Sequence, residues 1–118
     1  MSIIDLLSGN SRLVKIAAGD LIFAQGDRGE VMYVVAEGQA QILIDGKAVE
    51  TVAAGGIVGE MALIDSGARS ASAIAKTECL LVPLDERGFR ELVSRQPEFA
   101  LLVMSILVQR LRRMDSEH

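Results

Sequence analysis

The sequence predicts a mainly β domain of the sandwich, barrel or jelly-roll type, flanked by helices. Short apolar runs separated by glycine-containing turns follow one another through most of the chain, a pattern typical of these architectures. Two segments near the C-terminus have helix start signals and apolar faces instead. The length of 118 residues fits one domain, and 50% hydrophobic residues are enough for a core. We therefore expect a single domain over residues 1–118.

Short apolar runs predict strands within a β region of about residues 12–84. The runs are RLVKIA, LIFA, VMYVVA, AQILI, KAVETV, SASAIA and CLLV. The clearest hairpin joins AQILI to KAVETV, because Asp45-Gly46 supplies the positive φ angles that a two-residue type I′ turn requires. Lys47 and Glu50 are expected on the polar face of this hairpin.

Helices are predicted at both ends of the chain. The segment IIDLL favours a short helix over about residues 3–7. A second helix is expected over about residues 86–95, because Asp85 is placed to cap its N-terminus. A third is expected over about residues 97–114, with Pro97 at the favoured first helical position.

The last helix carries apolar residues on two sides. One set has the 4, 3, 4, 3 spacing of a heptad seam: Ala100, Met104, Leu107, Leu111 and Met114. A second stripe beside it consists of Phe99, Leu102, Val103 and Ile106. Such a helix must be covered on both sides, which favours a homodimer through this helix. The alternatives are a helix fully buried in a monomer and a seam that contacts an output domain outside this chain.

The composition argues against several classes of partner. Lys and Arg number 12 against 16 Asp and Glu, for a net charge of −4. Without a basic face, neither nucleic acid nor an anionic membrane is an expected partner. The single cysteine, Cys79, cannot form an internal disulfide, as is typical of a reducing compartment. The N-terminus lacks the features of a signal peptide, so a cytoplasmic location is expected.

Residues 56–73, GIVGEMALIDSGARSASA, contain the residues that carry chemistry. Gly59 allows close approach of a ligand to the backbone, and one helical turn after it would offer free N–H groups to an anion. Arg69 supplies a planar cation suited to phosphate oxygens, and Ser70 a hydroxyl. Glu60 would repel a phosphate and is better suited to accept from a sugar hydroxyl. Alternatively, Glu60 and Arg69 form a salt bridge that only fixes a loop.

At this stretch the chain resembles the cyclic nucleotide-binding domains of the bacterial catabolite activator, the regulatory subunits of cyclic AMP-dependent kinase and cyclic nucleotide-gated channels. The phosphate-binding cassette of the family is similar to V-G-E-M-A-L-I-D-S-G-A-R-S-A here, and AAGDLIFAQGDRGEVMYVVAEGQAQI is similar to its first strands. The resemblance extends to about Met114. It implies an eight-stranded β-roll of jelly-roll topology, with a terminal helix that closes over the base.

The resemblance also implies roles for individual residues. Gly59 and the backbone of Met61 and Ala62 would lie against the cyclic phosphate and sugar, and Glu60 would accept from the ribose 2′-hydroxyl. Arg69 would pair with the exocyclic phosphate oxygens. The remaining implied contacts are phosphate donors at Ser70 and Ala71 and a base or lid contact at Arg112 or Arg113.

The chain departs from the family pattern in two ways. Val58 replaces the usual phenylalanine before Gly59, which changes packing and leaves the phosphate contacts intact. No helix-turn-helix, kinase or channel segment follows the terminal helix, so we expect either a stand-alone sensor or one domain of a longer protein.

The function expected is a non-enzymatic sensor that binds cyclic AMP, or alternatively cyclic GMP, and signals through its C-terminal helix. A second hypothesis is a dimerising or scaffolding module with a vestigial pocket, which does not depend on ligand. A metal protein or enzyme on a jelly roll is disfavoured because the only histidine is His118 and the motifs of nucleophiles and phosphate loops are missing. No cofactor and no metal are therefore expected.

Overall fold

The computed structural model describes residues 12–63 and 67–116, with side chains up to Arg113. The helix predicted at residues 3–7 lies outside the described residues. The strands in chain order are β1 (Val14–Ile16), β2 (Leu21–Phe23), β3 (Val31–Glu37), β4 (Gln39–Ile44), β5 (Lys47–Ala53), β6 (Ile57–Val58), β7 (Ser72–Ala75) and β8 (Cys79–Asp85). A 3₁₀ helix η1 (Glu60–Leu63) follows β6, and two helices, α2 (Glu86–Arg95) and α3 (Glu98–Ser116), follow β8.

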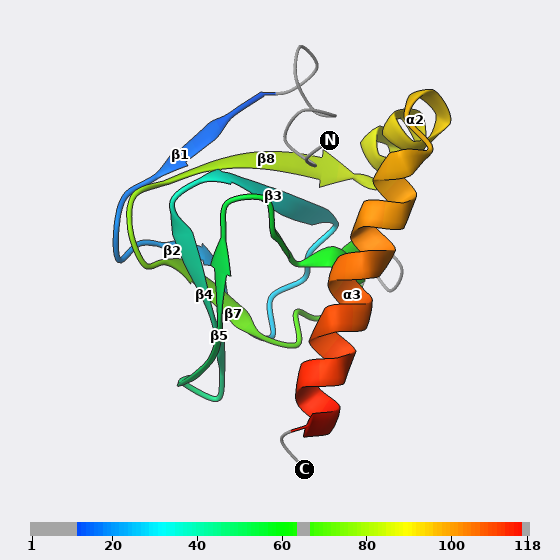
Figure 1. Ribbon diagram of the computed structural model, residues 1–118. Helices are drawn as coiled ribbons and strands as arrows, with labels where there is room; N and C mark the ends of the chain where they lie inside the picture. The colour runs from blue at the N-terminus through cyan, green and yellow to red at the C-terminus, as the bar shows by residue number, and fades with distance from the viewer. Residues whose placement is uncertain (1–11, 64–66, 117–118) are drawn as a thin grey trace.

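The eight strands form two four-stranded antiparallel sheets (Figure 1). One has the order β1-β8-β3-β6 and the other the order β2-β7-β4-β5. This architecture confirms the predicted mainly β fold with C-terminal helices. The two-residue strand β6 is too short to be seen as an apolar run in the sequence.

Local turn and cap signals acted as expected. Asp45 and Gly46, between β4 and β5, have φ angles of 51° and 80°, and both positive values fit the predicted type I′ turn. Asp85 caps α2, since its carboxylate accepts a hydrogen bond from the backbone N–H of Gly88 at 2.7 Å. This bond satisfies one of the amides that the first turn of a helix leaves without a partner.

Strand β3 contributes to two hydrophobic clusters because its side chains alternate between its faces. On one face, Met32 and Val34 pack with Phe99 and Val103 of α3 in the cluster under the helices. On the other face, Val35 belongs to the cluster between the two sheets. Helix α3 is therefore fixed to the outside of the roll by its own buried residues, and Figure 1 shows it running along the roll toward the β4–β5 hairpin.

The exposed apolar row on α3 differs from the predicted seam. Leu101, Met104, Val108 and Leu111 are exposed, with spacings of 3, 4 and 3. Leu107, assigned to the seam by its spacing, instead packs against the cluster under the helices. The heptad reading was wrong at this position because the roll covers a wider arc of α3 than one stripe. In the described part of the chain, no helix is long and apolar enough to cross a membrane.

Candidate functional site: a pocket between the roll and helix α3

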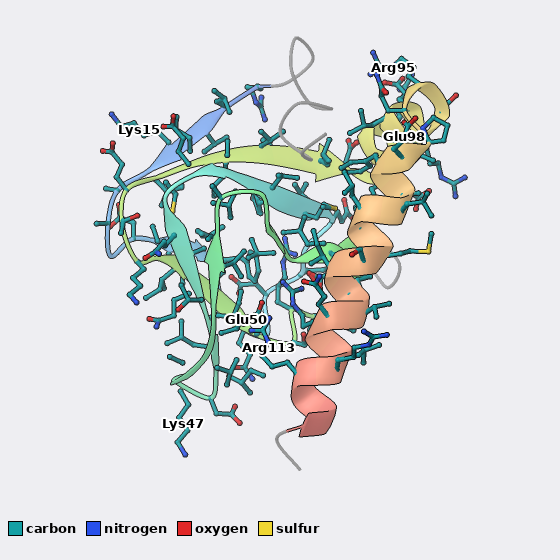
Figure 2. The ribbon with its side chains drawn as sticks, viewed as in Figure 1. Lys15, Lys47, Glu50, Arg95, Glu98 and Arg113 are labelled. Carbon is teal, nitrogen blue, oxygen red and sulfur yellow. The ribbon has the colours of Figure 1, made fainter. Side chains whose placement is uncertain are left out.

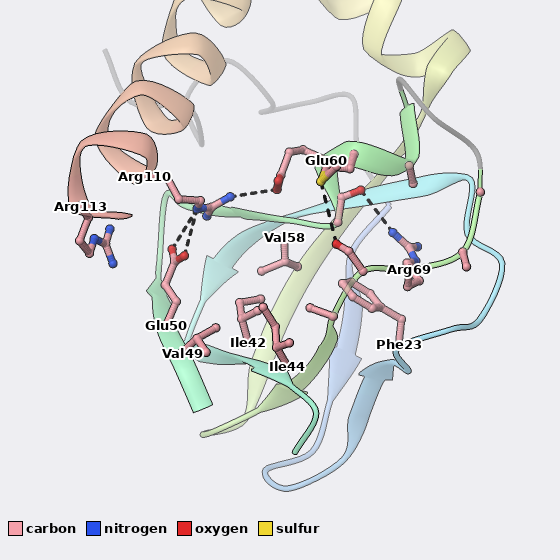
Figure 3. Close-up of a pocket in the computed structure, with 17 residues that line it drawn as sticks. Phe23, Ile42, Ile44, Val49, Glu50, Val58, Glu60, Arg69, Arg110 and Arg113 are labelled. Atoms are coloured by element: carbon pink, nitrogen blue, oxygen red, sulfur yellow. Dashed lines mark hydrogen bonds and ion pairs between the residues drawn. The ribbon is translucent and has the colours of Figure 1, made fainter. Parts of the chain in front are cut away.

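A cavity of about 440 Å³ lies between the β-roll and the C-terminal half of α3 (Figure 3). It is bounded by the β4–β5 hairpin, by the β6–η1 segment, by residues 67–71 and by α3. One wall is apolar and is formed by Ile42, Ile44, Val49 and Val58. The charged residues that line it are Glu50, Glu60, Arg69, Arg110 and Arg113.

Gly59 forms the turn that leads the backbone from β6 into η1 at the edge of the pocket. Its φ angle is 76°, in the left-handed region that favours glycine. A Cβ at this position would lie 2.6 Å from Nη1 of Arg69 and 3.0 Å from the ring of Phe23. Glycine is therefore required both by the backbone angle and by the close packing of Arg69. The turn leads into η1, whose first N–H groups lack acceptors within the helix.

Arg69 is held at the pocket wall by backbone oxygens and by an aromatic ring. Its Nη1 donates to the carbonyl of Gly59 at 3.2 Å, and its Nη2 donates to the carbonyl of Val31 at 2.8 Å. The guanidinium carbon lies 4.1 Å from the centroid of the Phe23 ring. Burial lowers the pKa of Arg69, while interactions with Tyr33 and Glu60 raise it. A guanidinium remains protonated in proteins, and because it has five N–H donors, Arg69 retains donors for an anion.

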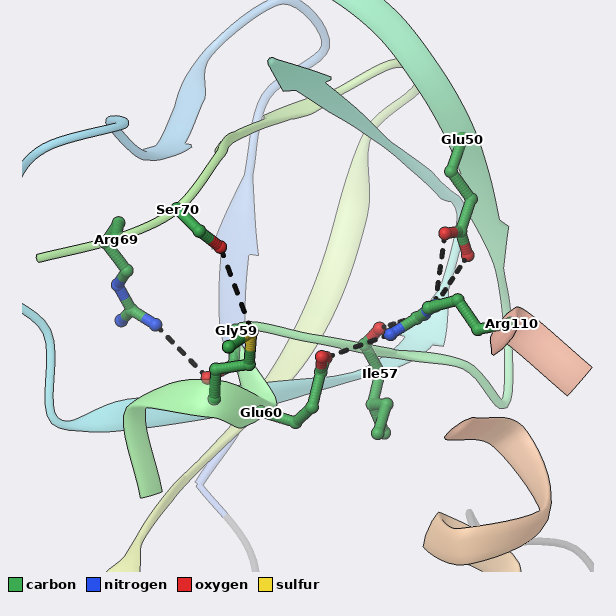
Figure 4. Close-up of polar contacts among 8 residues, drawn as sticks. Glu50, Ile57, Gly59, Glu60, Arg69, Ser70 and Arg110 are labelled. Carbon is green, nitrogen blue, oxygen red and sulfur yellow. Dashed lines mark hydrogen bonds and ion pairs between the residues drawn. The ribbon is translucent and has the colours of Figure 1, made fainter. Parts of the chain in front are cut away.

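Glu60 forms an ion pair with Arg110 and not with Arg69, the cation considered in the sequence analysis. Its Oε1 lies 3.0 Å from Nη1 of Arg110 on α3. Figure 4 shows Glu60 and Arg69 directed to separate partners on either side of Gly59. The alternative in which Glu60 and Arg69 close a salt bridge on each other is thus not what the structure contains.

Glu50 was expected on the polar face of the hairpin, and this expectation was wrong. The register pairs Leu43 with Ala48 but Ile42 with Glu50, so a β-bulge at Val49 shifts the alternation by one residue. Glu50 therefore shares a face with Ile42 and lines the pocket. Its carboxylate oxygens both lie 3.1 Å from Nε of Arg110, and Figure 2 shows it between the roll and α3.

Arg110 was missed by the sequence reasoning. Besides its two carboxylates, its Nη2 donates to the carbonyl of Ile57 at 3.0 Å. A signal was available, since Arg110 follows Ile106 by four residues and so continues the buried stripe of the helix. A charged residue at such a position indicates a buried partner.

The residues named from the sequence gather at this pocket, with one exception. The cavity is lined by Gly59, Glu60, Met61, Ala62, Arg69, Ser70, Ala71 and Arg113. Arg112 is exposed on α3 and is not one of the lining residues. Within residues 12–63 and 67–116, no group of three His, Cys, Asp or Glu residues is arranged to hold a metal ion.

Comparison with known proteins identifies the family to which this fold belongs. The sequence model of a family described as "Cyclic nucleotide-binding domain" matches residues 13–96. The chain belongs to this family. A solved structure, the catabolite activator protein of Thermus thermophilus, superposes with a TM-score of 0.82 and 32% identity, over 98% of this chain and 56% of that one.

Curated relatives include regulators of two kinds. The cyclic AMP receptor protein of Thermus thermophilus is 36% identical over 104 residues, which are 84% of this chain and 48% of the relative. A cAMP-dependent protein kinase regulatory subunit of Eremothecium gossypii is 35% identical over 78 residues, 66% of this chain and 17% of the relative. The chain thus spans half or less of the length of these proteins.

Proposed function

We propose that this chain is a non-enzymatic regulatory module that binds a cyclic nucleotide in the pocket beneath α3. The observation that carries the proposal is the placement of Arg69, the start of η1 and Glu60 around one cavity, with Arg69 and Glu60 engaged by different partners. Arg69 and the η1 amides suit a phosphate. Glu60, on the other side of Gly59, suits a sugar hydroxyl.

The remaining walls match the other parts of such a ligand. Ser70 and Ala71 follow Arg69 along the pocket edge and would donate to phosphate oxygens from a hydroxyl and a backbone N–H. The apolar wall of Ile42, Ile44 and Val58 offers a surface for the flat base. Arg113, at the α3 side of the cavity, would face the base, whereas the position of Arg112 gives it no such contact.

Cyclic AMP is the expected ligand, with cyclic GMP as the alternative. The relatives named for cyclic AMP support the first, while the hydroxyl of Ser70 is compatible with both. Titration calorimetry of the purified chain with cyclic AMP, cyclic GMP and linear 5′-AMP tests the proposal. We expect saturable heat with a cyclic nucleotide and weaker binding of 5′-AMP. Absence of heat at millimolar concentrations of both cyclic nucleotides would refute it.

Signalling would proceed through α3, because this helix contributes Arg110 and Arg113 to the pocket. A ligand shifts a helix only if it binds one helix position better than the other. Raising a state of a few percent to dominance requires a differential affinity of roughly 3–5 kcal/mol. The signal would pass either to a domain beyond this chain or to a partner that binds α3 in one of its two positions.

A second candidate function is a dimerising or scaffolding module that does not depend on ligand. It is favoured by the exposed apolar row of α3, formed by Leu101, Met104, Val108 and Leu111. The 3–4 spacing of this row fits the same helix from a second copy. Native mass spectrometry with and without nucleotide distinguishes the two functions, because a dimer that is indifferent to nucleotide favours scaffolding.

A further inference from the structure

Glu50 and Glu60 share the single guanidinium of Arg110 (Figure 4). The two carboxylates come from different elements, β5 and η1, and Arg110 comes from α3. The side chains of Glu50, Glu60 and Arg110 are only 15%, 16% and 20% exposed. We call these three side chains, with the carbonyl oxygen of Ile57, the Arg110 cluster.

The cluster connects α3 to the roll at two places: β5, through Glu50, and the β6–η1 segment, through Ile57 and Glu60. Nε of Arg110 contacts Glu50, Nη1 contacts Glu60 and Nη2 contacts the Ile57 carbonyl. Each of the three nitrogens therefore has its own acceptor. Loss of the Glu60 contact would leave Nε bound to a carboxylate and Nη2 bound to a carbonyl, so Arg110 would remain paired in a largely buried site.

The proposed function gives Glu60 a second partner. Oε1 of Glu60 contacts Arg110, and a sugar hydroxyl that also donates to this carboxylate draws on the same negative charge and weakens that contact. A guanidinium left without a carboxylate in a partly buried site is strongly unfavourable. A chain with only Glu60 beside Arg110 would therefore hold α3 less firmly once the ligand is bound, whereas this chain has Glu50 as a second anionic partner.

We propose that Glu50 is a positioning residue, which keeps Arg110 and α3 attached to the roll while Glu60 binds the sugar hydroxyl of the ligand. This inference rests on the proposed function of the pocket. The β-bulge at Val49 creates the arrangement, because it turns Glu50 from the outer face of the hairpin toward α3.

Glu50→Gln tests the inference, because it removes the charge and preserves the shape. We expect the dissociation constant for cyclic AMP to rise about tenfold, which is the effect of losing about one hydrogen bond to a charged group. Hydrogen exchange of α3 is the second readout. Addition of nucleotide should leave exchange at residues 106–113 unchanged or slower in the wild-type chain and should accelerate it in Glu50→Gln.

Two further variants separate this role from a structural one. Glu78→Gln removes a carboxylate from an exposed ion pair with Lys15 at 3.7 Å and should behave as wild type. In an Arg110→Met background, Glu50→Gln should have no additional effect on affinity, because the residue acts through Arg110. If Glu50→Gln does not fold, Glu50→Asp, which keeps the charge on a shorter side chain, should show a smaller change in the same direction.

The outcomes test the role of Glu50 and the binding of a cyclic nucleotide by the pocket separately. A wild-type chain that binds neither cyclic nucleotide refutes the proposed function, and the inference with it. A wild-type chain that binds, together with Glu50 variants of unchanged affinity and unchanged α3 exchange, overturns the inference alone. Persistence of the Glu50→Gln effect in the Arg110→Met background also overturns it.

Discussion

The ring of Phe23 lies against the guanidinium of Arg69, with the guanidinium carbon 4.1 Å from the ring centroid. Phe23 is itself stacked on Tyr33, with ring centroids 6.3 Å apart. The aromatic pair thus supports one side of the cation, while the carbonyls of Gly59 and Val31 fix its nitrogens. Arg69 is held in place by the protein before any anion contributes.

Replacement of Phe23 by leucine should weaken nucleotide binding. Leucine keeps an apolar side chain but removes the cation–π contact, which contributes about 0.5–2 kcal/mol. We expect the affinity measured by calorimetry to fall by roughly twofold to thirtyfold, as that range converts. Phe23→Tyr keeps the ring and serves as the matched control, with affinity near wild type. Equal affinities for the leucine and tyrosine variants would show that the ring does not position Arg69.

Removal of the Arg69 side chain should have a larger effect on binding. Arg69→Ala removes charge-assisted contacts to the phosphate, and we expect a loss of about 2–4 kcal/mol in binding free energy. Arg69→Lys should bind with intermediate affinity, because it keeps the charge and loses the fork of donors. Calorimetry gives the affinities, and thermal melting checks that each variant is folded.

The exposed Arg87, in an i, i+4 pair with Glu91 on α2, offers a control for loss of positive charge alone. Arg87→Ala should bind as wild type. Normal nucleotide affinity in folded Arg69→Ala would contradict the assignment of the phosphate to this end of the pocket.

Local sequence signals predicted much of the fold. Asp45-Gly46 defined a hairpin turn, and Asp85 defined the start of α2, because each acts on backbone groups a few residues away. The glycine turns and apolar runs predicted the strands for the same reason. These interactions depend on neighbours in sequence, so the sequence alone was sufficient.

The features that were missed depend on residues far apart in the chain. The bulge at Val49 changes the facing of Glu50 and arises only when β5 pairs with β4. Arg110 meets Glu50 from 60 positions away and Glu60 from 50 positions away. Alternation along an isolated strand placed Glu50 on the wrong face, and only the assembled fold brings Arg110 to the pocket.

Cys79 should be an unreactive thiol in the folded chain. Its side chain is fully buried between the sheets. Burial raises the pKa of the Cys79 thiol, although the backbone hydrogen bond to Gln39 acts in the opposite direction. Because the thiolate is the nucleophile, iodoacetamide should modify native Cys79 much more slowly than the unfolded chain at pH 8. Equal rates in the two states would contradict this burial.

The raised pKa also predicts how stability depends on pH. Below the unfolded pKa of about 8.5, both states hold the proton and Cys79 contributes no dependence on pH. Above it, the unfolded chain loses the proton while the folded chain keeps it, so the unfolding free energy falls as pH rises toward the folded pKa. Urea unfolding at pH 7 and pH 9.5 should show a larger loss in wild type than in Cys79→Ala, which does not titrate.

The exposed apolar row of α3 should mediate self-association. Leu101 and Val108 are seven residues apart and both are exposed, so they would occupy equivalent heptad positions in a helix pair with a second copy. The double variant Leu101→Glu/Val108→Glu places charges in that contact and should convert a dimer to a monomer. Because both side chains are exposed in the single chain, the fold should survive, as circular dichroism and melting would show.

The control for this experiment is Gln109→Glu, which adds one charge to an exposed position on another side of α3. Light scattering across a concentration range from 1 to 100 µM, roughly the span over which moderate interfaces assemble, should give a dimer for wild type and for Gln109→Glu. The double variant should remain a monomer throughout. A wild-type chain that stays monomeric over the whole range would show that this row does not join two copies by itself, and a dimer that survives both glutamates would place the interface elsewhere on the chain.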